Sequence, residues 1–171
     1  EIPCYDAVFA DIGDEQSLTS SLSTFSGHLN RIQAVLEEKT ETSLVLLDEV
    51  GTGTDPDDGS ALGVALLQAL AGFGANGTLL TLSTTHHNPL SALKYQDGRF
   101  ENACVEFDAD TLSPTYRVLW GVPGRSNALT IAEKLELQES VVDAARERLG
   151  GDWVGFETQV AQLEEARVAF T

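Results

Sequence analysis

The sequence predicts an α/β fold with a parallel β-sheet, and three observations support the prediction. Two short apolar runs, residues 43–50 and 78–84, each end abruptly in polar residues, as buried parallel strands do. Segments with apolar residues at helical spacing alternate with these runs. The chain has 171 residues, 42% of them hydrophobic, which is enough for the core of one domain.

The other elements are predicted from apolar periodicity and from turn residues. A first strand is expected over residues 4–12, where apolar and polar residues alternate. Helices are expected over residues 20–39, 58–71, 128–135 and 139–149, with another near residues 89–95. Residues 103–108 and 115–119 flank a Leu-Ser-Pro turn, so they are predicted to pair as an antiparallel edge of the sheet.

The composition limits what this chain can bind. Its formal net charge is −17, from 27 acidic and 10 basic residues, which is unfavourable for contact with the phosphate backbone of a nucleic acid. Any contact with DNA is therefore expected to come from segments outside this chain. No apolar stretch reaches the roughly 18 residues of a membrane span, so no membrane association is expected. The chain does not begin with Met and has no basic-then-apolar leader, so an internal piece of a longer protein is expected, or else a processed or mispredicted product.

Two adjacent carboxylates stand near the end of the first apolar run. They are Asp48 and Glu49, and a Gly-Thr-Gly-Thr turn begins at Gly51. The carboxyl ends of parallel strands are where α/β proteins bind their ligands. In a nucleoside triphosphatase, an Asp at this place holds Mg²⁺ and a Glu polarises the attacking water. The simpler alternative is that both acids only end the strand and are solvated.

A histidine follows the second apolar run in the same way. That run ends in Thr84, Thr85 and His86. Neighbouring parallel strands deliver their ends to one edge of the sheet, so His86 is expected near Glu49, where it would sense a γ-phosphate or orient water. A lone histidine after a strand is more often a packing or surface residue, and His87 is expected to have no chemical role.

The means of binding phosphate are only partly present. Ser23 and Thr24 stand at the start of the first long helix, where hydroxyl side chains usually cap and where free N–H groups also bind phosphate. A G-x-x-x-x-G-K-[ST] loop occurs nowhere in the chain. Because acids alone repel ATP, the isolated chain is expected to have very weak ATPase activity or none.

Three motifs in sequence order resemble the MutS family. The run SLVLLDEVGTGT at residues 43–54, followed by Gly59, resembles the MutS signature with its Walker B acids and D-loop. LSTFS at residues 22–26 resembles the MutS counterpart of the ABC-transporter signature loop, and TTH at residues 84–86 resembles the switch-histidine motif. The resemblance covers roughly residues 3–149 and is specific, because independent motifs occur in the family's order.

Other stretches resemble the second MutS branch, whose members usually lack the mismatch-reading domain and end in a Smr nuclease domain. FADIGDEQS at residues 9–17 and GVPGRSNA at residues 121–128 are typical of that branch. LKYQDGRFEN at residues 93–102 is most similar to cyanobacterial or plastid versions. The chain departs from the family at His87, where Tyr or Phe is more usual, and at Thr52, where the mismatch-repair branch tends to have Arg. It also lacks the clamp helices, the Smr domain and the Walker A loop, which would precede residue 1.

The resemblance implies roles for single residues. Asp48 would hold Mg²⁺ through water, Glu49 would activate the hydrolytic water, and His86 would contact the γ-phosphate of ATP. Ser23 and Thr24 would reach the ATP of the opposite subunit in a head-to-tail homodimer. Two further residues are implied near the nucleotide: Asp55 in the D-loop and Gln16 in the loop that couples the nucleotide to the DNA clamp.

The resemblance also implies an architecture and a function. The fold would be an ABC-class P-loop NTPase sheet with helices on both faces, incomplete at its N-terminal end. Residues 1–149 would be the ATPase domain, and residues 150–171 would begin a helical linker. The full-length protein would be an ATPase that binds mismatched or branched double-stranded DNA through domains missing here, in mismatch repair or suppression of recombination.

Three alternatives remain open from the sequence. The chain could be a dimerisation module that does not hydrolyse ATP, or belong to a ribosome-associated ATPase of the same branch. A third reading is another ABC-class ATPase of the structural-maintenance type, which the turn at Gly51 and the text of residues 112–128 disfavour. The compartment is expected to be the cytoplasm for a bacterial protein and the plastid for an algal or plant one.

Overall fold

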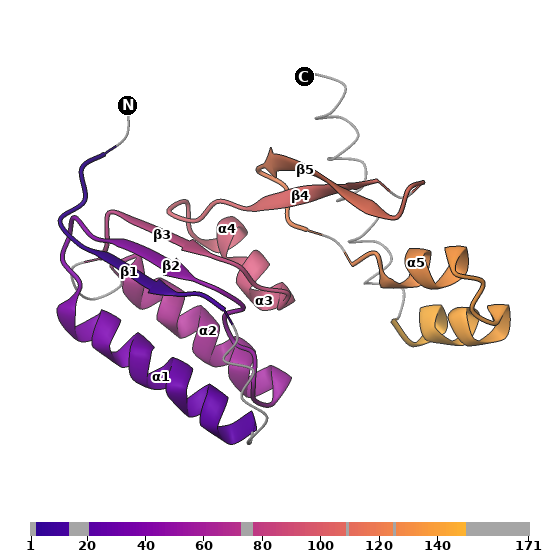
Figure 1. Cartoon of the computed structure of the whole chain (residues 1–171), viewed down its shortest axis with the longest axis horizontal. Coiled ribbons are helices and arrows are strands. Elements are labelled where there is room, and N and C mark those ends of the chain that lie inside the picture. The colour runs from indigo at the N-terminus through magenta and orange to yellow at the C-terminus, as the bar shows by residue number, and fades with distance from the viewer. Residues whose placement is uncertain (1–2, 14–20, 73–76, 109, 125, 150–171) are drawn as a thin grey trace. The chain divides into compact units, whose positions relative to one another are not determined.

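The computed structural model describes residues 3–13, 21–72, 77–108, 110–124 and 126–149, without the side chains of residues 21–24. The fold is mixed α/β, and the chain divides into two compact units, Glu1–Phe100 and Glu101–Thr171 (Figure 1). Gln16 and the expected linker over residues 150–171 lie outside the described residues. The expected end of the ATPase domain at residue 149 stays a prediction.

The first unit has the predicted order of strand, helix, strand, helix, strand. Its elements are β1 (Val8–Asp11), α1 (Ser21–Glu38), β2 (Leu44–Leu47), α2 (Pro56–Leu70) and β3 (Leu80–Ser83). The strands are parallel in the order β1-β2-β3, with Asp11 opposite Leu47 and Leu47 opposite Ser83. The strands therefore end at one common edge. Each is shorter than predicted, because the apolar runs continue into turns that leave the ladder.

One face of the sheet carries the core of this unit. Both α1 and α2 lie on the same side of the three strands (Figure 1). Right-handed crossovers between strands in sequential order place both helices on one side. Val45 of β2 and Leu70 of α2 are fully buried there. The cluster also includes Val35, Leu47, Val50, Leu66, Leu67, Leu90 and Leu93.

The opposite face of the sheet is apolar and open within the described residues. Period-2 alternation points every second strand residue to this side. Val8 is 61% exposed and Leu82 47% exposed, and they share the face with Ala10, Leu44, Leu46 and Leu80. The prediction of helices on both faces is therefore not met in the described part, because sequential crossovers leave α1 and α2 together.

After β3 the first unit ends in two short helices. They are α3 (Asn88–Ser91) and α4 (Leu93–Gln96), where one helix near residues 89–95 was predicted. Leu90 of α3 and Leu93 of α4 are both buried in the core. The chain therefore forms two short helices here, each with one leucine in the core, instead of one continuous helix. Among the described helices, none combines the length and apolar character that crossing a bilayer requires.

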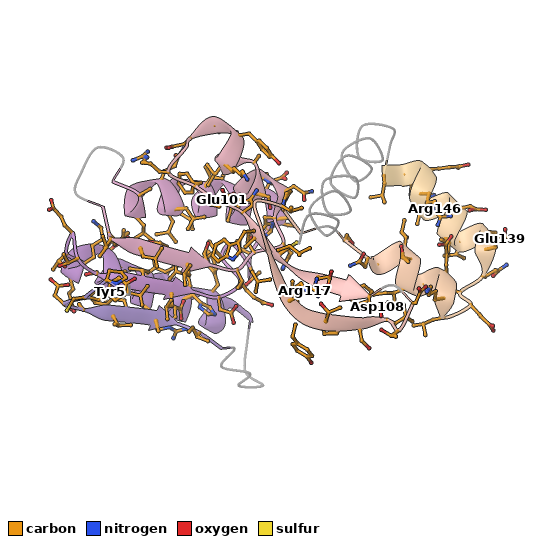
Figure 2. All side chains as sticks on the ribbon, turned by 90° about the horizontal axis from the view of Figure 1, so that it is seen from above. Tyr5, Glu101, Asp108, Arg117, Glu139 and Arg146 are labelled. Atoms are coloured by element: carbon orange, nitrogen blue, oxygen red, sulfur yellow. The ribbon has the colours of Figure 1, made fainter. Side chains whose placement is uncertain are left out.

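The second unit contains β4 (Ala103–Asp108), β5 (Ser113–Trp120), α5 (Ala128–Lys134) and a helical stretch over residues 139–149. The β4-β5 pair is antiparallel, as predicted, but it forms a separate two-stranded sheet. The prediction that it is an edge of the parallel sheet is wrong, because β4 and β5 form their ladder hydrogen bonds with each other and not with β1, β2 or β3. Figure 2 shows Asp108 and Arg117 on this hairpin, and Glu139 and Arg146 on the helical stretch.

Candidate functional site

The two predicted acids lie at the carboxyl edge of the parallel sheet, in a sharp turn. The backbone N–H of Asp48 donates to the carbonyl oxygen of Asp11 at 2.8 Å, so Asp48 still lies beside β1. Glu49 has a φ of 48°, a left-handed conformation that is uncommon for a residue with a side chain. The N–H of Thr52 closes the turn onto the Glu49 carbonyl at 3.1 Å. This turn leaves the Glu49 side chain exposed and Asp48 half-buried.

Thr84, at the end of β3, holds both acids. Its hydroxyl donates to Asp48 Oδ1 and accepts the backbone N–H of Glu49 at 2.8 Å. Its own N–H donates to the Leu47 carbonyl at 3.0 Å, and its carbonyl accepts from the N–H of Val50 at 3.0 Å. One hydroxyl can donate once and accept, so both contacts form together. Thr84 thus couples the end of β3 to the orientation of Asp48 and Glu49.

Two glycines bring the acid turn against helix α2. Gly51 has a φ of +92°, and a Cβ there would lie only 2.7 Å from the carbonyl oxygen of Gly59. A Cβ on Gly59 would in turn overlap the carbonyl oxygen of Gly51. Both positions therefore require glycine, since backbone atoms face each other with no space for a side chain. This contact explains the spacing of the two glycines in the motif.

A buried carboxylate from β1 joins helix α1 to the same edge. Asp11 is 4% exposed, and its Oδ1 accepts from Arg31 Nε at 2.5 Å. Its Oδ2 lies 2.7 Å from His28 Nδ1. Arg31 and His28 come one turn apart on α1. No role was predicted for His28 or Arg31 from the sequence. The one available signal is that Asp11 stands at the end of β1, much as Asp48 follows β2.

Two cavities open at these residues. A small polar cavity of about 70 Å³ is lined by Gly13, His28, Asp48, Glu49 and Thr52. A larger cavity of about 550 Å³ lies between α1 and α2 and extends to the acid turn, with Phe25, Leu36, Leu62 and Leu66 in its lining. Both cavities border His28, Asp48 and Glu49, but the lining of the larger one is mainly apolar and that of the small one is mainly polar.

The two histidines after β3 have different surroundings. His86 is exposed, and its ring lies 5.0 Å from the ring of His87, centroid to centroid. Among the described residues, His86 makes no hydrogen bond to Asp48 or Glu49. The backbone N–H of His87 donates to Thr85 Oγ1 at 3.1 Å, and its ring packs beside Gly51. His87 Nε2 is buried and has no hydrogen-bond partner within the described part of the chain, so His87 packs against the acid turn while His86 faces outward.

The other predicted nucleotide contacts remain predictions. Asp55 caps α2, since its Oδ1 accepts the N–H of Asp57 at 2.9 Å and that of Asp58 at 3.4 Å. This capping role was not predicted for Asp55, but an Asp at a helix start before Pro56 is a sequence signal for it. Ser23 and Thr24 lie in the first turn of α1, and their side chains are not described.

The acids suit a magnesium ion that is held mainly by water and phosphate. Within the described ranges, no group of three or more His, Cys, Asp or Glu side chains could hold a metal ion. Mg²⁺ commonly uses one or two carboxylates together with waters and substrate phosphates. Asp48 fits this use, because Thr84 contacts its Oδ1 and leaves the second carboxylate oxygen for another partner.

Comparison with known proteins decides the family. The family profile of MutS domain V matches residues 1–151. The chain belongs to the MutS family. A relative named endonuclease MutS2 from Synechocystis is 51% identical over 98% of this chain. Proteins of the same name from Exiguobacterium sibiricum and Halothermothrix orenii are both 47% identical, over 98% and 97% of this chain.

These comparisons confirm the predicted MutS resemblance and its second branch. The matched regions make up 22%, 21% and 20% of the three relatives, so this chain spans about a fifth of their length. The MutS match includes the acid turn, α1 with Ser23 and the end of β3 with His86.

Proposed function

We propose that this chain forms the hydrolytic part of an ATPase site in a MutS-type protein that binds DNA. The observation that carries the proposal is the acid turn itself: Asp48 and Glu49 at the carboxyl edge of a parallel sheet, both held by Thr84. Membership in the MutS family, through its domain V, supports the same reading.

In this proposal each acid has a separate task. Asp48 holds Mg²⁺ through water, with the carboxylate oxygen that Thr84 leaves free. The ion, when bound with ATP, neutralises charge that develops on the phosphate oxygens. Glu49 accepts a proton from the attacking water, and its exposed side chain can reach a substrate outside the sheet edge. His86 contacts the γ-phosphate from the end of the neighbouring strand.

We further propose that the phosphate-binding half of the site lies in the longer protein. This chain has no G-x-x-x-x-G-K-[ST] loop, and it spans about a fifth of its relatives. The open apolar sheet face, with Val8 and Leu82 exposed, supports an ABC-class P-loop sheet in which another segment covers that side. Because the net charge of −17 repels ATP, the purified chain alone is expected to show no measurable ATPase activity.

The partners of the longer protein are part of the proposal. Ser23 and Thr24, at the start of α1, contact the ATP of a second subunit in a homodimer, and Asp55 and Gln16 lie near the nucleotide. Double-stranded DNA, mismatched or branched, binds through other domains, because the net charge of −17 on this chain is unfavourable for contact with a phosphate backbone. The ribosome is the alternative partner. Bacterial relatives favour the cytoplasm as the compartment.

The substitution Glu49→Gln in the full-length protein tests the proposed reaction. It keeps size and hydrogen bonding but removes the proton acceptor, so we expect the turnover number for ATP to fall by about 10²- to 10⁴-fold with nucleotide binding retained. Glu41→Gln is the matched control, since Glu41 is exposed in the loop before β2, at the opposite end of that strand. Equal turnover in both variants would refute the assignment of Glu49.

A further inference from the structure

A histidine on helix α1 lies at the same small cavity as the two acids. The side chain of His28 is 19% exposed and lines the cavity of about 70 Å³ together with Asp48, Glu49 and Thr52. Its Nδ1 lies 2.7 Å from Asp11 Oδ2. Asp11 reaches this place because it ends β1, the strand beside the one that leads to the acid turn. Residues from three sequence segments thus meet at one cavity.

The contact with Asp11 fixes which ring nitrogen of His28 is available. Arg31 Nε contacts the other oxygen of Asp11 at 2.5 Å, so the carboxylate is ion-paired and acts only as an acceptor. Arg31 Nη2 also lies 3.2 Å from His28 Nδ1, but the contact of Nδ1 with Asp11 Oδ2 is shorter, at 2.7 Å, so Nδ1 carries the hydrogen and donates it to Asp11. In the neutral ring, Nε2 keeps its lone pair and is an acceptor. Asp11 and Arg31 therefore hold His28 in one tautomer and one orientation.

The small cavity is large enough for water and lined for it. One water molecule needs a cavity volume of roughly 10–15 Å³. A volume of about 70 Å³ therefore holds several waters. The Glu49 carboxylate and His28 Nε2 are both acceptors, so one water between them would donate both of its hydrogens. The lone pairs of that water oxygen then remain for attack on phosphorus.

We propose that His28 is a further residue of the hydrolytic site and that it holds the attacking water together with Glu49. The inference rests on the proposed ATPase function. In the reaction, the water oxygen bonds to the γ-phosphorus while the bond to the β,γ-bridging oxygen breaks. ADP takes that electron pair, Glu49 takes one proton, and His28 orients the water. Asp11 is a positioning residue that acts through His28.

Two substitutions at position 28 separate this role from a purely structural one. In His28→Asn, the amide nitrogen takes the place of Nδ1 and keeps the bond to Asp11, but no group replaces Nε2. In His28→Gln, the amide takes the place of Nε2, and the bond to Asp11 is lost. If His28 only fastens α1 to β1, the Asn variant keeps its kcat and the Gln variant loses activity. If His28 holds water, the Gln variant has the higher kcat of the two.

The experiment measures steady-state ATP hydrolysis and nucleotide binding in the full-length protein. We expect His28→Asn to lower kcat by about 10-fold, the loss of one hydrogen bond to the reacting water, with KM within about 2-fold. His28→Gln is expected to recover part of that kcat. Gln33→Ala is the control on the same helix, because Gln33 is exposed and its side-chain amide donates to Glu37, one turn further along α1. It is expected to match the wild type.

The reference variant Glu49→Gln keeps the two proposals distinguishable. If it loses turnover while His28→Asn keeps wild-type kcat, the role of His28 is overturned and the proposed function stands. If Glu49→Gln also keeps turnover, the proposed function itself fails. A lower kcat in His28→Asn with an unchanged thermal midpoint, and partial recovery in His28→Gln, supports the proposal.

Discussion

The contact between Gly51 and Gly59 predicts a large effect from one methyl group. Gly59→Ala places a Cβ over the carbonyl oxygen of Gly51 and 3.0 Å from its carbonyl carbon. Both atoms are backbone, in a turn that the hydrogen bonds of Asp48, Val50 and Thr52 hold in place. The turn cannot rotate aside as a flexible side chain would. The methyl group is therefore accommodated only by moving α2 away from the acid turn.

Two opposing terms give the magnitude. Replacing Gly by Ala in a helix favours the folded state by about 1 kcal/mol. Overpacking against a rigid neighbour costs about 3 kcal/mol, the upper end of the usual range. The net expectation for Gly59→Ala is a loss of about 2 kcal/mol in the free energy of unfolding, or roughly 4–8 °C in the thermal midpoint of a domain of this size. Turnover of ATP is expected to fall as well, because the turn carries Glu49.

Gly63→Ala, one turn further along α2, is the matched control. A Cβ there would lie 3.0 Å from Leu90 Cδ2 and 3.2 Å from Val50 Cγ1, and both are side-chain atoms that can shift. Thermal unfolding followed by circular dichroism, with ATP turnover in parallel, compares the two variants in the full-length protein. We expect Gly63→Ala to remain within about 1 kcal/mol of the wild type. Equal midpoints for the two variants would refute the argument from backbone contact.

Two further predictions concern single hydrogen-bonding groups. Thr84→Val removes the hydroxyl that contacts both Asp48 and Glu49, so we expect kcat for ATP to fall about 10-fold or more. Thr84→Ser keeps a hydroxyl and is expected to have a kcat near that of the wild type. Equal kcat values for the Val and Ser variants would contradict this role of the hydroxyl. The hydrogen bond from Arg99 lowers the pKa of Asp97 from 3.8 to about 2, so its contribution to stability is present above about pH 4 and is lost as the pH falls toward 2. Carboxyl-carbon NMR titration should show that Arg99→Ala returns this pKa toward 3.8, and an unchanged titration would contradict the cause.

Short-range patterns led to most elements of the first unit. The run that ends at Asp48 is apolar because β2 is buried in the sheet, and its polar ending marks the turn. The pattern overestimated β2, which ends at Leu47 rather than at residue 50. The left-handed φ of Glu49 turns the chain out of the ladder, and a side-chain pattern contains no direct sign of a backbone angle. The β4-β5 hairpin was predicted from two short strands around a turn, which is also a local pattern. The sequence did not predict that the hairpin forms a sheet of its own.

The sequence by itself determined the βαβαβ order, the pair of acids after β2 and the MutS resemblance, because each depends on neighbouring residues or on motifs in chain order. Only the tertiary structure decided that Thr84 contacts both acids, that Gly51 touches Gly59, and that Asp11 contacts His28. His28 and Asp11 are separated by 17 residues and belong to different elements. They meet because α1 connects β1 to the parallel strand β2 and packs across the sheet, which brings His28 beside the end of β1. This packing depends on contacts between distant residues, so no local sequence pattern predicts it.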